Sequence, residues 1–130
     1  MKTITFVDEV DGAIKSFCCQ VSVYQKYGGR CAYCGQKITL HEMQVDHIEP
    51  IRRGLMQLPE EIERLSHIDN LNPACGPCNH RKRTHPVEEF RAEIASQVER
   101  LRRDRNQFRM AERYGQIEAT GKPVIFWFER

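Results

Sequence analysis

The chain has 130 residues, a length that favours a single domain with a modest hydrophobic core. Hydrophobic residues make up 40% and charged residues 29% of the chain, and we find neither a membrane-spanning run nor a signal-peptide pattern, so we expect a soluble cytoplasmic protein with no membrane partner. The net charge of +2 is too small to establish nucleic-acid binding, and the distribution of the charges along the chain is more informative.

The N-terminal part is predicted to form a strand, a helix and a tight turn. Residues 4–7 alternate and are rich in β-branched side chains, which favours a short strand. Residues 13–27 carry apolar side chains at helical spacing, and two glycines end this predicted helix. Cys18 and Cys19 lie in its apolar stretch and are predicted to be buried, unreactive thiols.

The middle of the chain is predicted to form a hairpin followed by a short helix. Residues 43–48 are expected to be a strand that ends before a proline, and residues 70–72 a second strand that returns antiparallel to it. The polar connection between them contains a short helical patch at residues 60–65. Pro77 suits the first turn of a helix, which we expect at residues 78–83.

The C-terminal part is predicted to form one long amphipathic helix and a final strand. Residues 86–114 have apolar side chains near helical spacing, and the stripe from Phe90 to Leu101 is expected to face the core. Residues 123–128 are expected to form a strand, with Trp127 packed in the core or at a sheet edge. Two interpretations, phosphate contacts or a solvated face balanced by acids, remain for Arg100, Arg102, Arg103, Arg105, Arg109 and Arg113.

Two Cys-x-x-Cys pairs, Cys31/Cys34 and Cys75/Cys78, predict a metal site. In an intracellular chain such pairs favour a metal over disulfides, and four thiolates satisfy the tetrahedral preference of zinc without leaving an open position. The pairs are separated by about 40 residues, more than the roughly 15–20 of a zinc ribbon, so a substantial segment is inserted between them. We therefore predict a structural zinc ion and expect the inserted segment to carry the chemistry.

That inserted segment contains an Asp-His pair. Because neighbouring residues of a strand point to opposite faces, Asp46 and His47 are not expected to bind one metal side by side. A carboxylate suits a hard cation such as Mg²⁺, whereas a neutral histidine suits general-base work near pH 7. Asn79, at the start of the short helix, offers a second oxygen ligand, and Asn70 is expected to bond across the hairpin.

These residues resemble a known family. The pattern Cys31-x-x-Cys34, Val45-Asp46-His47-Ile48-x-Pro50, Asp69-Asn70-Leu71 and Cys75-x-x-Cys78-Asn79-x-x-Lys82 is similar to phage and bacterial HNH endonucleases of the ββα-metal type. The resemblance is strongest over residues 24–82. It implies an α+β fold, in which a core hairpin and helix are stapled by a four-cysteine zinc site, with flanking helices and a short terminal strand. We expect one nuclease domain over residues 1–130, with its motif core at about 24–93 and a C-terminal helix and strand at 94–130.

The resemblance also implies residue roles. His47 is expected to be the general base that activates water, and Asp46 an acidic ligand of the catalytic cation. Asn70 is expected to fix the hairpin and the base. Asn79 stands where the family has His or Asn as the other metal ligand, which favours Mg²⁺ or Mn²⁺ over Zn²⁺. His80 is the alternative at that position.

The implied function is a metal-dependent endonuclease that hydrolyses phosphodiester bonds in DNA, with structural Zn²⁺ and catalytic Mg²⁺ or Mn²⁺. Phosphate contacts are expected from Arg52, Arg53, Arg81 and Lys82. The alternative is a zinc-stapled nucleic-acid-binding module without turnover. Nicking and double-strand cleavage, and a monomer and a homodimer, are all compatible with the sequence. The remaining histidines, which have no ligand partners by spacing, are expected at the surface: His41, His67 and His85.

Overall fold

The computed structural model describes residues 12–51 and 58–130, with side chains described from residue 19 onwards in these ranges. The predicted strand at residues 4–7 lies outside the described residues, as do the candidate phosphate contacts Arg52 and Arg53. None of the helices in the described part of the chain is long and apolar enough to cross a membrane.

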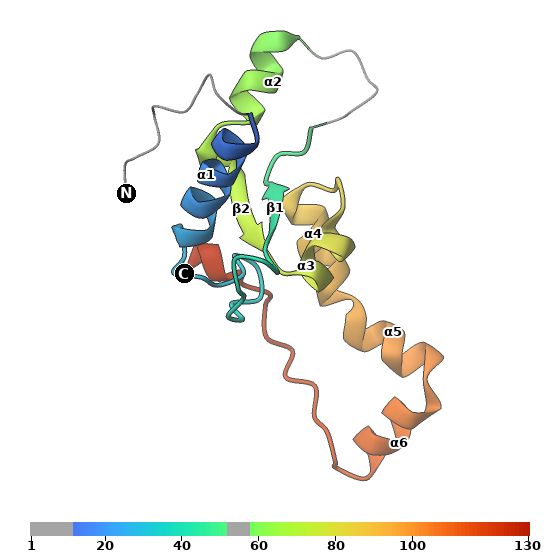
Figure 1. Cartoon of the computed structure of the whole chain (residues 1–130). Coiled ribbons are helices and arrows are strands. Elements are labelled where there is room, and N and C mark those ends of the chain that lie inside the picture. Colours follow the sequence, from blue (N-terminus) through green and yellow to red (C-terminus); the bar gives the residue numbers. More distant parts are fainter. Residues whose placement is uncertain (1–11, 52–57) are drawn as a thin grey trace.

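A two-stranded antiparallel sheet forms the centre of the fold (Figure 1). Strand β1 (Gln44–His47) pairs with strand β2 (Leu71–Ala74) in a register that places Asp46 opposite Asn72. Both of these polar residues are buried, so the hairpin turns a polar pair into the interior. The predicted hairpin is therefore confirmed.

The connection between the strands contains two short helices. Helix α2 (Pro59–Leu65) confirms the predicted helical patch, and the 3-10 helix η2 (Ile68–Asn70) follows it. Asn70 was expected at the start of the second strand, and that prediction is wrong because Asn70 ends η2 instead. The ring of His67 accepts a hydrogen bond from the amide of Asp69 at 3.2 Å, which stabilises this turn before the strand begins.

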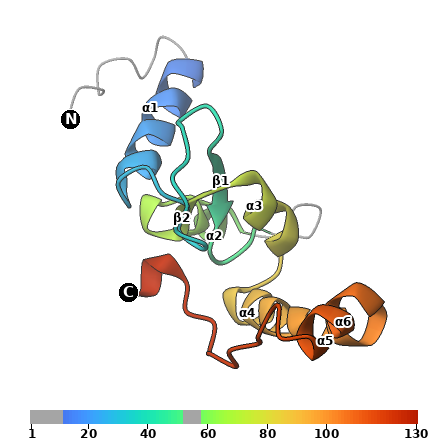
Figure 2. The ribbon, with the colours of Figure 1, turned by 90° about the horizontal axis from the view of Figure 1, so that it is seen from below.

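Two helices pack on the hairpin, one against each strand (Figures 1 and 2). Helix α1 (Gly12–Gln25) contacts β2, and helix α3 (Gly76–Lys82) contacts β1. The sulfur of Cys75 caps α3 by accepting a hydrogen bond from the amide of Cys78 at 3.4 Å. Pro77 lies in the first turn of α3, as the sequence predicts.

The predicted long C-terminal helix is wrong: three helices occupy its place. They are α4 (Val87–Ala95), α5 (Gln97–Asp104) and α6 (Asn106–Arg113), and Figure 1 shows α5 and α6 projecting away from the hairpin. Phe90 and Ile94 belong to the core region, but the rest of the predicted stripe does not reach it, with Val98 37% and Leu101 40% exposed. Without a core to cover, the apolar stripe does not enforce one continuous helix.

The break between α5 and α6 is held by polar contacts. Arg105 has extended backbone angles, with φ −122° and ψ 112°, and ends α5. The guanidinium of Arg109 donates to the carbonyls of Arg102 and Arg103 at 2.8 and 2.9 Å, which satisfies oxygens left open at the end of α5. The Arg102 side chain also bonds to Glu112 across the reversal, at 2.9 Å from Nε to Oε1.

The predicted strand at residues 123–128 is also wrong. The chain runs without regular structure to Phe126 and then forms the 3-10 helix η3 (Trp127–Glu129). The amides of the first two residues of η3 donate to the carbonyls of Tyr33 and Ala32, at 3.0 and 2.8 Å. Because its partner is the tight turn after α1 and not a strand edge, the segment forms two isolated bonds in place of a ladder.

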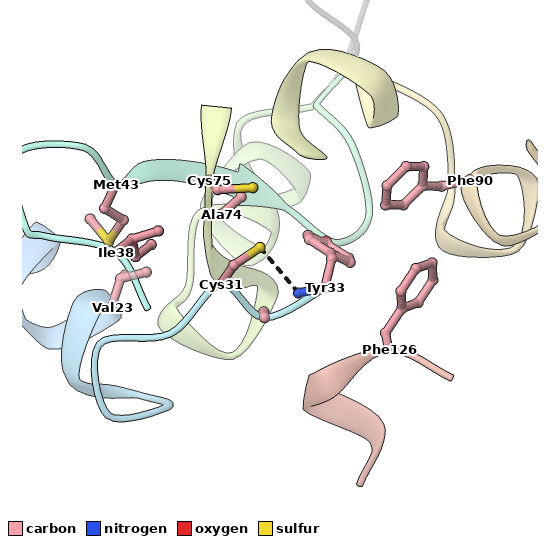
Figure 3. Close-up of a cluster of buried hydrophobic side chains, with 10 residues drawn as sticks. Val23, Cys31, Tyr33, Ile38, Met43, Ala74, Cys75, Phe90 and Phe126 are labelled. Carbon is pink, nitrogen blue, oxygen red and sulfur yellow. Dashed lines mark hydrogen bonds between the residues drawn. The ribbon is translucent and has the colours of Figure 1, made fainter. Parts of the chain in front are cut away.

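The core has two parts that meet at the cysteines (Figure 3). Tyr33, Phe90 and Phe126 form an aromatic group with ring centroids 5.2 to 5.4 Å apart. Figure 3 shows Cys31 and Cys75 between this group and an aliphatic group of Val23, Ile38, Met43 and Ala74. The aromatic group joins segments far apart in the sequence, so the C-terminal segment is part of the frame that supports the cysteines.

Candidate functional site

Four cysteines lie where the tight turn after α1 meets the end of β2 and the start of α3. Their sulfur atoms all lie within 4.8 Å of one another, with Cys34 and Cys75 3.8 Å apart, and belong to Cys31, Cys34, Cys75 and Cys78. Four sulfurs at this mutual distance are placed to share one metal ion, and the all-thiol donor set suits a structural zinc. The predicted grouping of the four cysteines is confirmed.

The local structure of the first cysteine pair requires a glycine. Gly35 has φ +78°, and a Cβ atom there would lie 2.6 Å from the Trp127 ring. The turn therefore closes tightly under η3, and the amide of Tyr33 points at the Cys31 sulfur at 3.4 Å. A hydrogen bond from the Cys78 thiol lowers the pKa of Cys31 to about 4 against the opposing effect of burial. Such a thiolate is the form that binds metal.

Asp46 lies at the bottom of a second site, next to α3. Its carboxylate is 4% exposed and accepts a hydrogen bond from the Tyr33 hydroxyl. The Lys82 ammonium lies 3.3 Å from one carboxylate oxygen and 3.1 Å from the other. Burial raises the pKa of Asp46 above its ordinary value, although the bonds from Tyr33 and Lys82 act in the opposite direction. Burial beside this carboxylate also raises the pKa of Tyr33.

Lys82 has a different place from the one expected. It was predicted to contact phosphates, but its side chain is 0% exposed. Its ammonium group donates to the main-chain carbonyl of His47 at 2.9 Å as well as to Asp46. The short α3 helix carries Lys82 back under β1, and this burial leaves the ammonium no surface to offer a phosphate.

Asp46 and His47 both line one cleft, although they are neighbours on a strand. The cleft has a volume of about 680 Å³ and is lined by residues of β1, α3 and the following turn, including Asp46, His47, Asn79, Arg83 and His85. The amide nitrogen of Asn79 donates to Gln44 Oε1 at 2.6 Å, a bond that does not use the amide oxygen. Asn79 lines this cleft, whereas His80 lines a separate cleft with Arg81.

Asn70 acts on the backbone beyond His47 and does not line the cleft. Its side chain accepts from the amide of Glu49 at 2.8 Å and donates to the carbonyl of the same residue at 3.0 Å. It also donates to the carbonyl of Leu65 at 2.7 Å. Asn70 thus bonds across the hairpin as predicted, and fixes the chain two residues after His47 to the end of α2.

The histidines outside the motif, Cys19 and Arg81 are at the surface. His41, His67 and His85 are exposed, as expected. Cys19 was predicted to be buried, and that prediction is wrong because its side chain is exposed on α1; the side chain of Cys18 is outside the described residues. Arg81 is exposed and lies 3.5 Å from Glu93.

Sequence reasoning missed Tyr33, and it placed Arg83 in a basic run beside the site without singling it out. Tyr33 lies between Cys31 and Cys34, and nothing in a Cys-x-x-Cys pair indicates that an intervening side chain reaches a carboxylate on β1. Arg83 follows Lys82 in a basic run, and spacing alone does not show which of these cations is exposed. The rotation of α3 relative to β1 would be needed to tell the buried Lys82 from the exposed Arg83.

The fold and the site together define a class of protein. A hairpin followed by a short helix, with four cysteines gathered at their junction and an Asp-His pair on the first strand, is an α+β arrangement of the ββα-metal type. Residues 31–85 match the HNH endonuclease family, and this part of the chain is an HNH endonuclease domain. The match contains both cysteine pairs and the candidate cleft residues Asp46, His47 and Asn79.

One solved structure extends this comparison. The chain is similar to the crystal structure of the Type II-C Cas9 enzyme from Actinomyces naeslundii, with a TM-score of 0.50 and 25% sequence identity. The match covers 62% of this chain and 8% of that enzyme, so the chain spans a small part of its length. No curated protein matches the chain. The family match at residues 31–85 is therefore the finding that indicates a nuclease domain.

Proposed function

We propose that the domain is a metal-dependent endonuclease that hydrolyses phosphodiester bonds in DNA. The observation that carries the proposal is that Asp46, His47 and Asn79 line the same cleft within a domain of a nuclease family. The cleft is lined by β1, α3 and the turn after α3, and we expect the nucleic-acid strand to enter it. An expected product pair is a 5′-phosphate and a 3′-hydroxyl.

His47 is the proposed general base. Its imidazole takes a proton from a water molecule, which attacks the phosphorus in line with the departing 3′ oxygen. The backbone of His47 is fixed from one side by the Lys82 ammonium, at 2.9 Å from its carbonyl. The Asn70 carbonyl accepts from the next amide, that of Ile48, at 2.8 Å. These bonds hold the base in position without using its ring.

Asp46 and Asn79 are the proposed ligands of the catalytic cation. A carboxylate and an amide oxygen from the same cleft are hard donors, which suit Mg²⁺ or Mn²⁺. A carboxylate has about four lone-pair positions, so the bonds from Tyr33 and Lys82 leave Asp46 some capacity for a metal. When bound, the cation offsets negative charge on the departing oxygen.

A plasmid-nicking assay tests the proposal. Purified protein is incubated with supercoiled DNA and Mg²⁺ or Mn²⁺, and nicked and linear products are quantified. We expect His47→Ala to lower the cleavage rate by about 10²- to 10⁴-fold, the usual contribution of a general base. His41→Ala is the matched control, because His41 is exposed and lies outside the cleft. Equal rates for wild type and His47→Ala would rule out His47 as the base.

One observation favours a second candidate, a zinc-stapled DNA-binding module without turnover. The Asp46 carboxylate already has the Lys82 ammonium 3.1 Å away, and this positive charge opposes the binding of a divalent cation beside it. DNA binding by the wild-type protein with no cleavage under any divalent cation would support the binding module. Cleavage that depends on the cation and on His47 would support the nuclease.

A further inference from the structure

Arg83 has a strained backbone at the rim of the candidate catalytic cleft. It directly follows α3, with φ 51° and ψ −127°, and among the described residues other than glycine it alone has a positive φ. The amide of His85 donates to the carbonyl of Lys82 at 2.9 Å, which closes a four-residue turn with Arg83 in second place. These angles are close to those of a type II′ turn, whose second residue is usually glycine.

Arg83 lines two neighbouring clefts. The first is the cleft of Asp46, His47 and Asn79. The second has a volume of about 460 Å³ and is lined by Pro77, His80, Arg81, Arg83, His85 and Glu93. Arg83 and His85 line both, so they form a shared wall between the candidate catalytic cleft and the second cleft beside it.

Arg83 differs from its basic neighbours in its electrostatic surroundings. Arg81 lies 3.5 Å from Glu93, and His85 lies 2.9 Å from Glu89. No carboxylate in residues 12–51 or 58–130 is within ion-pair distance of Arg83, and its side chain is exposed. The shared wall therefore carries a positive charge that no described carboxylate neutralises.

We propose that Arg83 binds a backbone phosphate of the nucleic acid next to the phosphate that is hydrolysed. This proposal rests on the proposed nuclease function of the first cleft. Strained backbone conformations concentrate at functional sites, where the position of a side chain matters more than local stability. A planar guanidinium matches a phosphate through two parallel hydrogen bonds, and such a contact holds the strand in place without reading its sequence.

The substitution Arg83→Gly separates strain from function. Glycine relieves the backbone strain, so we expect the Tm to rise by roughly 2–6 °C. Loss of one phosphate contact is expected to lower the affinity for a short DNA duplex about tenfold at 0.1 M salt. It is also expected to make the negative slope of log K against log salt less steep by about 0.9. Fluorescence anisotropy without added divalent cation measures binding in the absence of cleavage.

Two control variants define the outcome. Arg83→Lys keeps the charge and is expected to keep the salt slope. Lys122→Gly removes a charge from an exposed segment outside both clefts, and it is expected to change neither the DNA affinity nor the salt slope. An unchanged salt slope for Arg83→Gly, a fall in its Tm, or a wild type that does not bind DNA would each overturn the proposal. A wild type that binds DNA without cleaving it would refute the nuclease function while leaving the Arg83 contact measurable.

Discussion

Lys82 shows how a buried charge shapes the site. Its ammonium group has three oxygen neighbours, two on Asp46 and one on the His47 backbone, and its side chain is 0% exposed. A lysine is almost never buried to this degree without a partner. The same contact therefore neutralises the Asp46 carboxylate and fixes the strand that carries His47.

Removing Lys82 is expected to destabilise the protein strongly. In Lys82→Met the Asp46 carboxylate loses its buried counter-charge, which costs about 3–5 kcal/mol in the free energy of unfolding. Urea denaturation measures the loss, and Lys37→Met, at an exposed position, is expected to stay within about 0.5 kcal/mol of wild type. The double variant Asp46→Asn/Lys82→Met is expected to be more stable than Lys82→Met, because the uncompensated charge is gone. An undiminished stability of Lys82→Met would contradict this account.

At the scale of residues, the sequence predicted the members of the cleft better than their surroundings. Asp46, His47 and Asn79 were predictable because each occupies a fixed place in a recognisable motif, and the structure brings them to one cleft. The burial of Lys82 was not predictable, because helix periodicity does not show how far α3 rotates towards β1. The φ of Arg83 was equally inaccessible, since no glycine marks the turn.

At the scale of elements, the C-terminal segment is attached to the body by a few specific contacts. Phe126 is 3% exposed and stacks on Phe90 with the ring planes 10° apart. Arg91 on α4 lies over the Phe126 ring at 4.8 Å and donates to the carbonyl of Val124 at 2.6 Å, and it also pairs with Glu129. The segment thus packs as a lid on the aromatic half of the core.

Truncation of Phe126 tests this attachment. Phe126→Ala removes a buried aromatic side chain and is expected to cost about 3–5 kcal/mol. Ile125→Ala is the matched control, because Ile125 is 53% exposed and its loss is expected to change stability by less than about 0.5 kcal/mol. Chemical denaturation of the two variants gives the comparison. Similar stabilities for both would show that the segment is not part of the folded core.

Elements were predictable where local signals and packing agree. The hairpin, α1 and α3 follow from alternation, helical spacing and Pro77, and in the structure α1 packs on β2 and α3 on β1. The division of the helix predicted at residues 86–114 was not predictable. It depends on polar contacts between α5 and α6, such as Arg109 with the carbonyl of Arg102, that form only after the chain has reversed.

At the scale of the whole molecule, a zinc ion on the four cysteines would join both ends of the HNH domain. Cys31→Ser is expected to reduce the zinc content from about one per chain to none and to abolish a cooperative thermal transition, because binding free energy is folding free energy in such sites. Cys19→Ser is the control, since Cys19 is exposed and lies outside the cluster. Metal analysis and calorimetry measure the two effects. Full stability of the zinc-free protein would show that the cysteine site is dispensable.

The hydrogen bonds from η3 to the first cysteine turn also affect the timing of folding during synthesis. The amide of Phe128 completes the turn at Ala32, so the turn lacks its last support until the ribosome has passed residue 128. At about 5–20 residues per second, the interval after residue 78 is synthesised is roughly 3–10 s. During that interval the cysteines and the cleft residues are all present but the frame is incomplete. A nascent chain is thus expected to acquire its fully supported cleft only after the segment that covers the aromatic core, up to residue 128, has emerged from the ribosome.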